Sequence, residues 1–193
     1  MNDSFFALIS RMRHITRWGL MRNSEQENIQ EHSHMVAVLA HGLAVIRRDV
    51  FGVACDPNEY AVYALFHDAT EIITGDLPTP VKYSSAEITA AYHQVEALAA
   101  NKLLDTLPES LHPTYAPLLH VKETDSHYAL LKAADRISAY IKCIEERKAG
   151  NDEFISAERG LHTTLEQSDL PEVQYFLTHF LPAFAQTLDE IAP

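Results

Sequence analysis

Long segments that lack glycine and proline constrain this chain to a helical fold. The 193 residues include six glycines and nine prolines, and the prolines cluster at a few points. No stretch of useful length alternates apolar and polar residues as a half-buried strand would. The sequence therefore predicts an all-α fold, a single-domain helical bundle formed by residues 1–193.

Helix-ending residues and apolar periodicity indicate where each helix runs. Asp56-Pro57 is typical of an N-cap followed by proline at the first helical position. The prolines of segment 75–80 must end that helix, since proline cannot continue one, and Gly150-Asn151 is typical of a C-terminal stop. The predicted helices cover about residues 4–16, 31–51, 57–73, 85–106, 126–149, 152–167 and 171–191.

Composition excludes some classes of protein. A formal net charge of −12 argues against broad binding to the phosphate backbone of DNA or RNA, which needs a basic face. A small phosphorylated ligand remains compatible, because acidic groups can hold a divalent cation that attracts phosphate. No apolar run approaches the roughly 20 residues that span a bilayer, so no membrane segment is expected.

The N-terminus and the cysteines indicate a cytoplasmic protein. Residues 1–6 contain no basic region followed by an apolar stretch, so we expect no secretory signal. Cys55 and Cys143 stand alone, without CxxC spacing, and suit small core positions in a reducing compartment.

His32 is the first candidate for chemistry. At about 100° per residue it falls within the apolar stripe of its predicted helix, whereas His34 and His41 lie on the opposite, solvated side. A histidine inside an apolar stripe must find a partner, so His32 is either a hydrogen-bonded core residue or a ligand. The apolar positions near it are Met35, Val36, Leu39, Leu43 and Ile46.

A second set of polar residues interrupts an apolar helix. His67, Asp68 and Glu71 fall within five positions, and His67 and Glu71 share a helix face because they are four residues apart. Placing three such groups on an apolar helix costs desolvation unless something binds them.

Asp135 lies in a segment, 130–140, whose apolar positions occupy most of the helix circumference, so we expect a central helix. An ion pair with Lys132 or Arg136 is the alternative role for this carboxylate. Together with His32 and the pair His67-Asp68, however, it forms a mixed nitrogen and oxygen set. Such a set suits Mn, Co, Fe, Ni or Zn and leaves positions open for water and substrate.

These residues, in this order, resemble the H…HD…D signature of the HD-domain superfamily of metal-dependent phosphohydrolases, which implies a helical bundle of the HD-domain type. The chain is also similar, over nearly its whole length, to the bacterial 5′-deoxynucleotidase branch of that superfamily. The segments that carry this closer resemblance are Thr16–Asn23, Glu31–Ser33, Phe66–Ile72 and Thr74–Tyr83.

The resemblance implies an activity and partners. Members remove phosphate from 2′-deoxyribonucleoside 5′-monophosphates, largely spare ribonucleotides, form homodimers and use a divalent transition metal such as cobalt or manganese. Two-metal members of the superfamily carry further histidine ligands, which this chain lacks, so one metal ion is expected. Neither a nucleic acid polymer nor a membrane is an expected partner.

The resemblance also implies residue roles. The metal ligands are His32, His67, Asp68 and Asp135. A divalent ion lowers the pKa of a coordinated water. Glu71 would orient or deprotonate that water or protonate the leaving sugar oxygen, and Asp76, which faces the substrate, is the alternative acid or base.

Arg17 and Trp18 are the expected selectivity pair, with the guanidinium on phosphate and the indole beside the 2′ carbon of the sugar. Gly19 stands where the family carries proline, which could loosen the loop and weaken selectivity. The other expected substrate-binding residues are Asp76, Leu77, Pro78, Thr79 and Lys82. The Thr79 hydroxyl can donate a hydrogen bond. Lys82 either attracts phosphate or is a solvated surface charge.

Three alternatives stay open at this point. The first is an HD phosphohydrolase that acts on another nucleotide, such as a triphosphate or an alarmone. The second is a regulatory bundle that binds metal or nucleotide without turnover, which the presence of Glu71 and Asp76 disfavours. The third is a purely structural helical protein in which the histidines and aspartates meet by coincidence.

Overall fold

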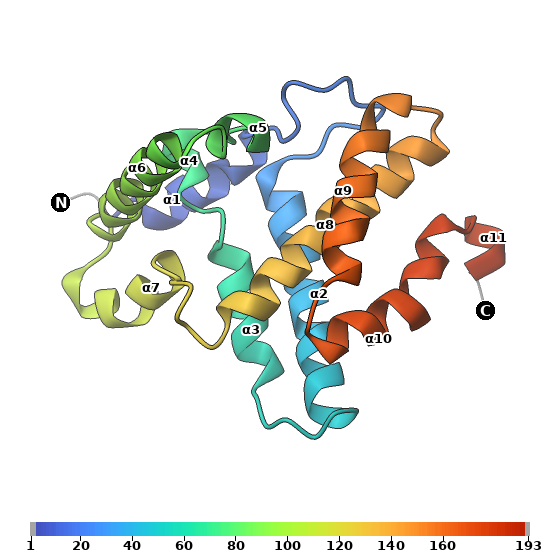
Figure 1. Cartoon of the computed structure of the whole chain (residues 1–193). Coiled ribbons are helices and arrows are strands. Elements are labelled where there is room, and N and C mark those ends of the chain that lie inside the picture. The colour runs from blue at the N-terminus through green and yellow to red at the C-terminus, as the bar shows by residue number, and fades with distance from the viewer. Residues whose placement is uncertain (1–2, 192–193) are drawn as a thin grey trace.

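Two 21-residue helices, α2 (Ile29–Asp49) and α8 (Tyr128–Lys148), form the centre of the protein. The computed structural model describes residues 3–191, and over that range it is built from helices and connecting segments, with one isolated β-bridge. Figure 1 shows α8 crossing α2 and α3 (Pro57–Phe66). The predicted all-α fold is therefore confirmed for the described residues.

Shorter elements surround this centre. A group made of α1, α6 and α7 lies on one side, and α9 to α11 lie on the other (Figure 1). Their bounds are α1 (Phe5–Ile9), η1 (Ser10–His14), α4 (Glu71–Thr74), α5 (Thr79–Lys82), α6 (Ala86–Leu104), η2 (Glu109–Leu111), α7 (His112–Leu119), η3 (Asp152–Phe154), α9 (Ile155–Glu166), α10 (Pro171–His179), η4 (Leu181–Ala185) and α11 (Leu188–Ile191).

Local sequence explains where the main helices begin and end. The Asn28 side chain accepts the backbone N–H of Glu31, whose carboxylate accepts the Asn28 N–H, so a capping box starts α2. The predicted cap at Asp56 is confirmed, since its side chain accepts the N–H of Asn58 at 3.0 Å. Gly150, at φ +80°, follows α8 in the left-handed conformation that ends many helices.

The apolar residues form two cores. The larger one lies between α2, α3 and α8, and the smaller one joins α1, α6 and α7. Ala64 belongs to the larger core and Ala69 to the smaller, and neither is accessible to solvent. The pair His67-Asp68 is therefore held between two packed regions.

The predicted helix over 57–73 is wrong in its continuity. It ends at Phe66, a turn follows, and α4 begins at Glu71. The reason is a change to tighter i→i+3 hydrogen bonds, from Ala69 N–H to Phe66 O at 3.0 Å and from Glu71 N–H to Asp68 O at 3.0 Å. His67 and Glu71 thus do not share one regular helix face.

Two further expectations need correction. The predicted helix over 171–191 is divided into α10, η4 and α11, and Pro182, which has no N–H to donate, lies at the first break. The helix α7 was missed because it contains Pro113 and Pro117, although a proline in the first turn is compatible with a helix.

Several further predictions concern the exposure of single residues and the ends of the chain. His32 is fully buried, and His34 and His41 are exposed, as predicted. Cys143 is buried and Cys55 partly so, and neither forms a disulfide. No helix within residues 3–191 is both long and apolar enough to cross a membrane. The first two and last two residues of the predicted 1–193 domain, Met1 and Asn2 of the N-terminal segment among them, lie outside the described residues.

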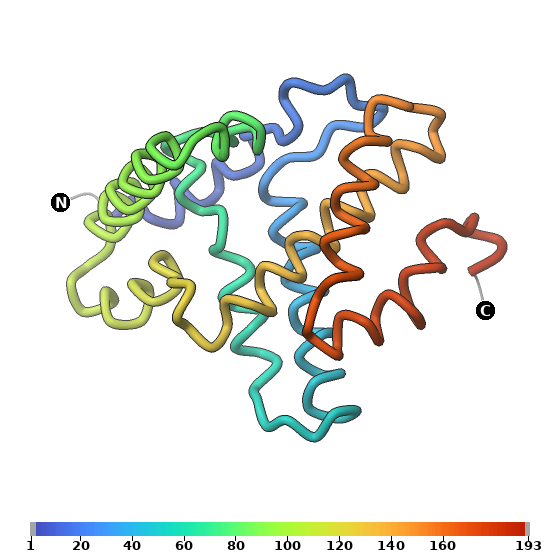
Figure 2. Tube along the Cα trace, viewed as in Figure 1, coloured from blue at the N-terminus to red at the C-terminus, as the bar shows by residue number. Residues whose placement is uncertain are grey.

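A buried polar cluster anchors the segment between η1 and α2, which passes beside the C-terminal end of α8 (Figure 2). Lys142 and Glu146, one helical turn apart on α8, form an ion pair. Lys142 donates to the Glu25 carbonyl at 2.6 Å, and Glu146 accepts the Ser24 N–H at 2.8 Å and the Asn151 side-chain amide at 2.8 Å. Burial alone would raise the pKa of Glu146, but these donors hold it at about 2.

Glu146→Ala should lower the free energy of unfolding by about 3 kcal/mol, because it leaves the Lys142 ammonium buried without its carboxylate. Urea denaturation followed by circular dichroism measures this change. The matched control is Glu145→Ala, which removes the exposed neighbouring carboxylate and should change the stability by less than about 0.5 kcal/mol. Equal losses in the two variants would contradict the anchoring role.

Candidate active site

Four polar residues from three segments meet at the centre of the protein. His32 comes from α2, Asp135 from α8, and His67 and Asp68 from the turn after α3. The Nε2 atom of His32 lies 3.1 Å from Asp135 Oδ1 and 3.6 Å from Asp68 Oδ2, and His67 Nε2 lies 3.1 Å from Asp68 Oδ2. One ligand atom from each of His32, His67 and Asp135 lies within 4.8 Å of the others, so this group could hold a metal ion.

The hydrogen bonds of His67 leave a lone pair pointing into this group. Its Nδ1 lies 2.7 Å from the Ala64 carbonyl, which can only accept, so Nδ1 carries the proton in the neutral ring. The opposite nitrogen, Nε2, is buried and has no hydrogen-bond partner. A lone pair beside an Asp68 oxygen is repulsive unless a proton or a metal ion lies between them, so this orphaned atom fits a metal ligand.

His32 is arranged in a similar way. Its Nδ1 lies 3.2 Å from the hydroxyl of Ser138 on α8, and its Nε2 faces the carboxylates of Asp68 and Asp135. A proton on Nδ1 donated to Ser138 would leave the Nε2 lone pair for a metal ion. Both imidazoles can therefore offer Nε2 at the same place.

The two aspartates of the group are held ionised. Burial by itself would raise the pKa of Asp68, but the neighbouring imidazoles of His67 and His32 lower it. Burial opposes ionisation of Asp135 as well, yet the His32 hydrogen bond and the Lys132 ammonium hold its pKa well below the ordinary value. Ionised carboxylates are the form that a cation requires.

Glu71 and Asp76 form a second, weakly solvated acidic pair beside the group. Burial, assisted by the charges of Asp68 and Asp76, raises the pKa of Glu71 to about 10, and its Oε2 atom has no hydrogen-bond partner. Burial also raises the pKa of Asp76, although Arg17 opposes the rise. Asp76 accepts the backbone N–H of Trp18 at 3.2 Å.

Arg17 and Trp18 lie beside the acidic groups. Burial would lower the pKa of Arg17, but the carboxylate of Glu27, and then those of Asp68 and Asp135, raise it. Trp18 has φ +59°, a conformation that non-glycine residues rarely adopt and that often marks functional sites. Its ring packs against Phe154 with centroids 5.2 Å apart.

The other residues expected to bind the substrate lie in different environments. Leu77 and Pro78 are partly buried, and Thr79 is the exposed first residue of α5. Lys82 donates to Glu96 at 2.8 Å. Its ammonium therefore has a carboxylate partner and is not simply a solvated charge.

Three residues near the group were not among the site residues predicted from the sequence. Ser138 faces His32, Glu27 pairs with Arg17 at 2.7 Å, and Lys132 lies with Nζ 3.7 Å from Asp135 Oδ2. The Lys132–Asp135 pair had appeared only as an alternative to metal binding, but both roles are compatible in the structure. Lys132 and Ser138 each stand three residues from Asp135 on α8, and this spacing was the only signal in the sequence. Glu27 gave none.

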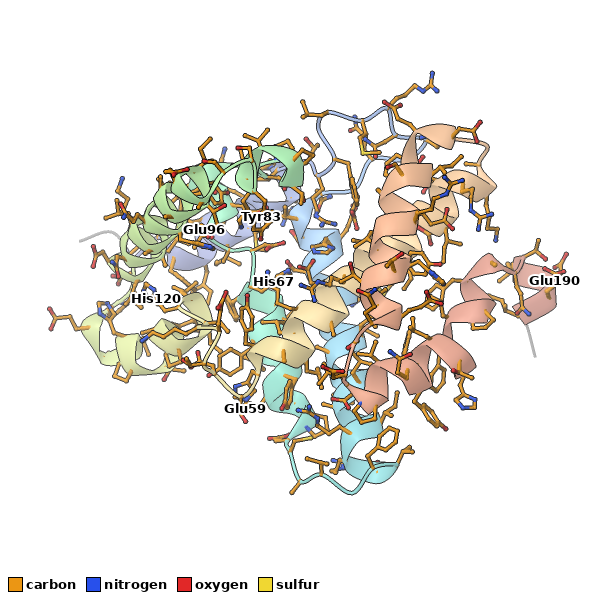
Figure 3. All side chains as sticks on the ribbon, viewed as in Figure 1. Glu59, His67, Tyr83, Glu96, His120 and Glu190 are labelled. Atoms are coloured by element: carbon orange, nitrogen blue, oxygen red, sulfur yellow. The ribbon has the colours of Figure 1, made fainter. Side chains whose placement is uncertain are left out.

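A cavity of about 480 Å³ opens from the group toward α6 and the α7–α8 connection. His67 and Asp135 line its inner end, and Lys82, Lys122 and Lys132 line its walls. Figure 3 labels four of its lining residues: His67, Tyr83, Glu96 and His120. Three carboxylates, Glu96, Glu123 and Asp135, line the cavity as well, so both charge signs surround it. A cavity with lysines in its wall that ends at a potential metal site could admit a phosphorylated ligand.

Solved structures with this fold define the class of the protein: it is an HD-domain phosphohydrolase by fold and by its H…HD…D residues. The HD-domain phosphohydrolase of Listeria innocua matches with a TM-score of 0.82 and 25% identity, covering 94% of this chain and 88% of that one. The cyanophage S-2L HD phosphohydrolase DatZ, solved with dA and one catalytic Zn²⁺ ion, matches with a TM-score of 0.63 and 22% identity over 94% of this chain and 96% of that one.

The chain belongs to the 5′-deoxynucleotidase YfbR-like family, which matches residues 4–184. A protein of Erwinia tasmaniensis named 5′-deoxynucleotidase is 45% identical, covering 99% of this chain and 97% of that protein. The Vibrio parahaemolyticus protein named 5′-deoxynucleotidase VP0926 is 47% identical over 97% of both chains. The family resemblance predicted from the sequence motifs is thus confirmed.

Glu71→Gln should stabilise the metal-free protein at pH 8 but not at pH 5. The folded pKa of Glu71, about 10, exceeds its ordinary value of 4.5, so ionisation favours the unfolded chain increasingly as pH rises between these values. Gln cannot ionise and avoids this loss. We expect the melting temperature of the variant at pH 8 to exceed that of the EDTA-treated parent by about 2–4 °C.

Thermal unfolding at the two pH values measures this difference. Glu109→Gln, which replaces an exposed glutamate on η2, is the control and should leave the melting temperature unchanged at both. A Glu71→Gln difference that is the same at pH 5 and pH 8 would rule out a raised pKa.

Proposed function

We propose that this protein is a metal-dependent 5′-deoxynucleotidase, which hydrolyses 2′-deoxyribonucleoside 5′-monophosphates to deoxynucleoside and phosphate. The observation that carries the proposal is the convergence of His32, His67, Asp68 and Asp135 beside the buried carboxyl of Glu71. Relatives named 5′-deoxynucleotidase, at 45–47% identity over nearly the whole chain, support the same activity.

We assign His32, His67, Asp68 and Asp135 as ligands of one divalent transition metal, with cobalt or manganese as the proposed ion. Two imidazole nitrogens and two carboxylate oxygens are a borderline donor set suited to these metals. When bound, the ion supplies two effects: it lowers the pKa of a water molecule and offsets charge on the phosphate oxygens.

Glu71 is the proposed acid or base of the reaction. A carboxyl group with a pKa raised by burial keeps a proton at neutral pH and can give it to the leaving sugar oxygen. Asp76 already accepts the Trp18 N–H through one oxygen. This contact supports a role for Asp76 in positioning the Arg17-Trp18 segment, and acid or base action is its alternative role.

The phosphate would be bound by cations around the cluster. The charges of Asp68 and Asp135 act on Arg17, and the Lys132 ammonium lies 3.7 Å from an Asp135 oxygen. A planar guanidinium and a compact ammonium near the metal group would together attract and orient a tetrahedral dianion.

Trp18 is the proposed selectivity residue, with the indole filling the space beside the 2′ carbon of the sugar. The fixed backbone and the packing on Phe154 support a rigid wall that an additional hydroxyl would meet. We propose that Leu77, Pro78 and Thr79 form the adjacent wall and that Lys82 adds attraction for phosphate at the cavity edge. Gly19, which follows Trp18 in a turn, remains the proposed cause of any weakened selectivity.

We further propose that residues 1–193 form one HD-type domain, that it forms homodimers, and that it is cytoplasmic. Exposed apolar residues on α6, including Ile88, Val95 and Leu98, support an interface between subunits. The nucleotide is the proposed small-molecule partner, without a role for nucleic acid polymers or membranes.

A second candidate function is hydrolysis of a nucleotide with a longer phosphate chain. The three lysines in the cavity wall, Lys82, Lys122 and Lys132, favour it, because they could neutralise more than one phosphate.

A panel of nucleotides tests the function. Protein stripped with EDTA and reloaded with cobalt or manganese is assayed with deoxy- and ribonucleoside mono-, di- and triphosphates by phosphate release. We expect the highest kcat/KM for deoxynucleoside monophosphates and no turnover before metal is restored. Preference for triphosphates would support the second candidate and overturn the first.

Asp68→Ala and Asp135→Ala should empty the metal site and lower kcat/KM by more than about 100-fold, since even indirect contacts to a metal can cost 10–100-fold. Metal content by mass spectrometry and activity are measured on the same samples. Asp169→Ala, which removes an exposed aspartate, is the control. Full metal content in both cluster variants would reject the ligand assignment.

Trp18→Ala should mainly admit ribonucleotides. We expect the ratio of kcat/KM for deoxyadenosine to adenosine monophosphate to fall by about 100-fold, which is what an apolar wall achieves against an added hydroxyl. Trp18→Phe retains an aromatic wall and should keep most of the ratio. The proposal fails if both variants discriminate as the parent does.

A further inference from the structure

We propose that Glu27 is the positioning residue of the substrate site, because one carboxylate oxygen fixes both the guanidinium of Arg17 and the indole of Trp18. This inference deepens the proposed function and rests on it for its substrate measurements. In this role Glu27 aligns Arg17, the proposed phosphate-binding residue, with Trp18, the proposed sugar-discriminating residue.

The contacts of Glu27 support this role. Its Oε2 atom accepts from Arg17 Nη1 at 2.7 Å and from Trp18 Nε1 at 3.3 Å. The carboxylate is 16% exposed and the Arg17 side chain 13%, so water screens the pair weakly. A charge-assisted hydrogen bond in such a setting is stronger and more directional than a neutral one.

The backbone brings Glu27 opposite Arg17 but does not orient their side chains. An isolated antiparallel bridge joins Thr16 and Asn28, and Arg17 N–H donates to the Glu27 carbonyl at 2.9 Å. Arg17 and Glu27 therefore lie opposite each other across this bridge, where side chains of paired residues can meet. The anchoring of residues 24 and 25 by Glu146 holds the far end of the same segment.

Arg17 keeps donors available for a ligand. A guanidinium has five N–H groups, and the bond to Glu27 is the one side-chain hydrogen bond of Arg17 among the described residues. The remaining donors lie in the field of Asp68, Asp76 and Asp135. The other anions that act on Arg17 are these acidic groups, so Glu27 keeps the guanidinium from pairing with them.

Orientation of the metal ligand His32 is the competing role for Glu27. The Oε1 atom lies 3.8 Å from His32 Nδ1, beyond hydrogen-bond distance. The hydroxyl of Ser138 lies nearer to that nitrogen, at 3.2 Å. The geometry therefore favours positioning of Arg17 and Trp18 over support of the metal ligand.

The sequence offers a direct optical test, because Trp18 is the single tryptophan of the chain. Intrinsic fluorescence and its quenching by acrylamide report the indole of Trp18 without any substrate. Glu27→Gln keeps the size of the side chain and removes its charge. Glu25→Gln is the matched control, since it removes an exposed carboxylate from the same segment without a side-chain contact to Arg17 or Trp18.

We expect Glu27→Gln to increase acrylamide quenching and to shift the Trp18 emission, while Glu25→Gln matches the parent. On the metal-loaded protein, KM for deoxyadenosine monophosphate should rise about tenfold, the loss of roughly one charge-assisted hydrogen bond, with a smaller change in kcat. The preference over adenosine monophosphate should fall in parallel, and the metal content should stay at the parent level.

Unchanged quenching together with unchanged KM in Glu27→Gln would overturn the inference. A loss of metal with an equal loss of kcat would also overturn it, because that result would mean that Glu27 orients the metal ligand His32 instead. If Glu27→Gln does not fold, Glu27→Asp decides by the same readouts, because it keeps the charge and withdraws it from the indole. A parent enzyme without activity on deoxynucleotides would reject the proposed function, while the fluorescence comparison still tests Glu27.

Discussion

The structure depends on bringing like charges together in a weakly solvated place. Asp68, Asp76 and Asp135 lie near one another, with Glu71 beside them, and their repulsion adds to the cost of burial. Imidazoles, Arg17 and Lys132 offset part of this cost, while Glu71 and Asp76 respond by raised pKa values. The remaining demand for positive charge is what a divalent cation would meet.

The four side chains of the group are positioned in two different ways. α2 and α8 are long, regular and packed along the larger core, so they place His32 and Asp135 rigidly. The pair His67-Asp68 instead occupies a tightened turn between Ala64 and Ala69, each packed in its own core. Packing on both sides of the turn keeps two adjacent side chains directed to one place, which a regular helix would separate by about 100°.

The segment between η1 and α2, which we propose binds the substrate, is held in another way. It has no regular helix, and its positions come from polar contacts: one bridge to Asn28, the acceptor carboxylates of Glu27 and Asp76, and the buried Glu146. Side-chain contacts of this kind can change with few substitutions, while the helices that hold the metal group stay the same. In the proposed function, the residues that set the chemistry are therefore held differently from those that set the choice of substrate.

The sequence by itself determined the helical class, the caps at Asp56 and Gly150, the burial of His32, and the order of residues that resembles the HD-domain signature. These are local: they follow from periodicity, from the backbone limits of proline and glycine, and from the chemistry of single side chains. Only the tertiary structure decided the break after Phe66, the helix α7, and the partnership of Glu27 and Lys132 with the site. Those features depend on which distant atoms pack or pair with a segment, and spacing along the chain does not carry that information.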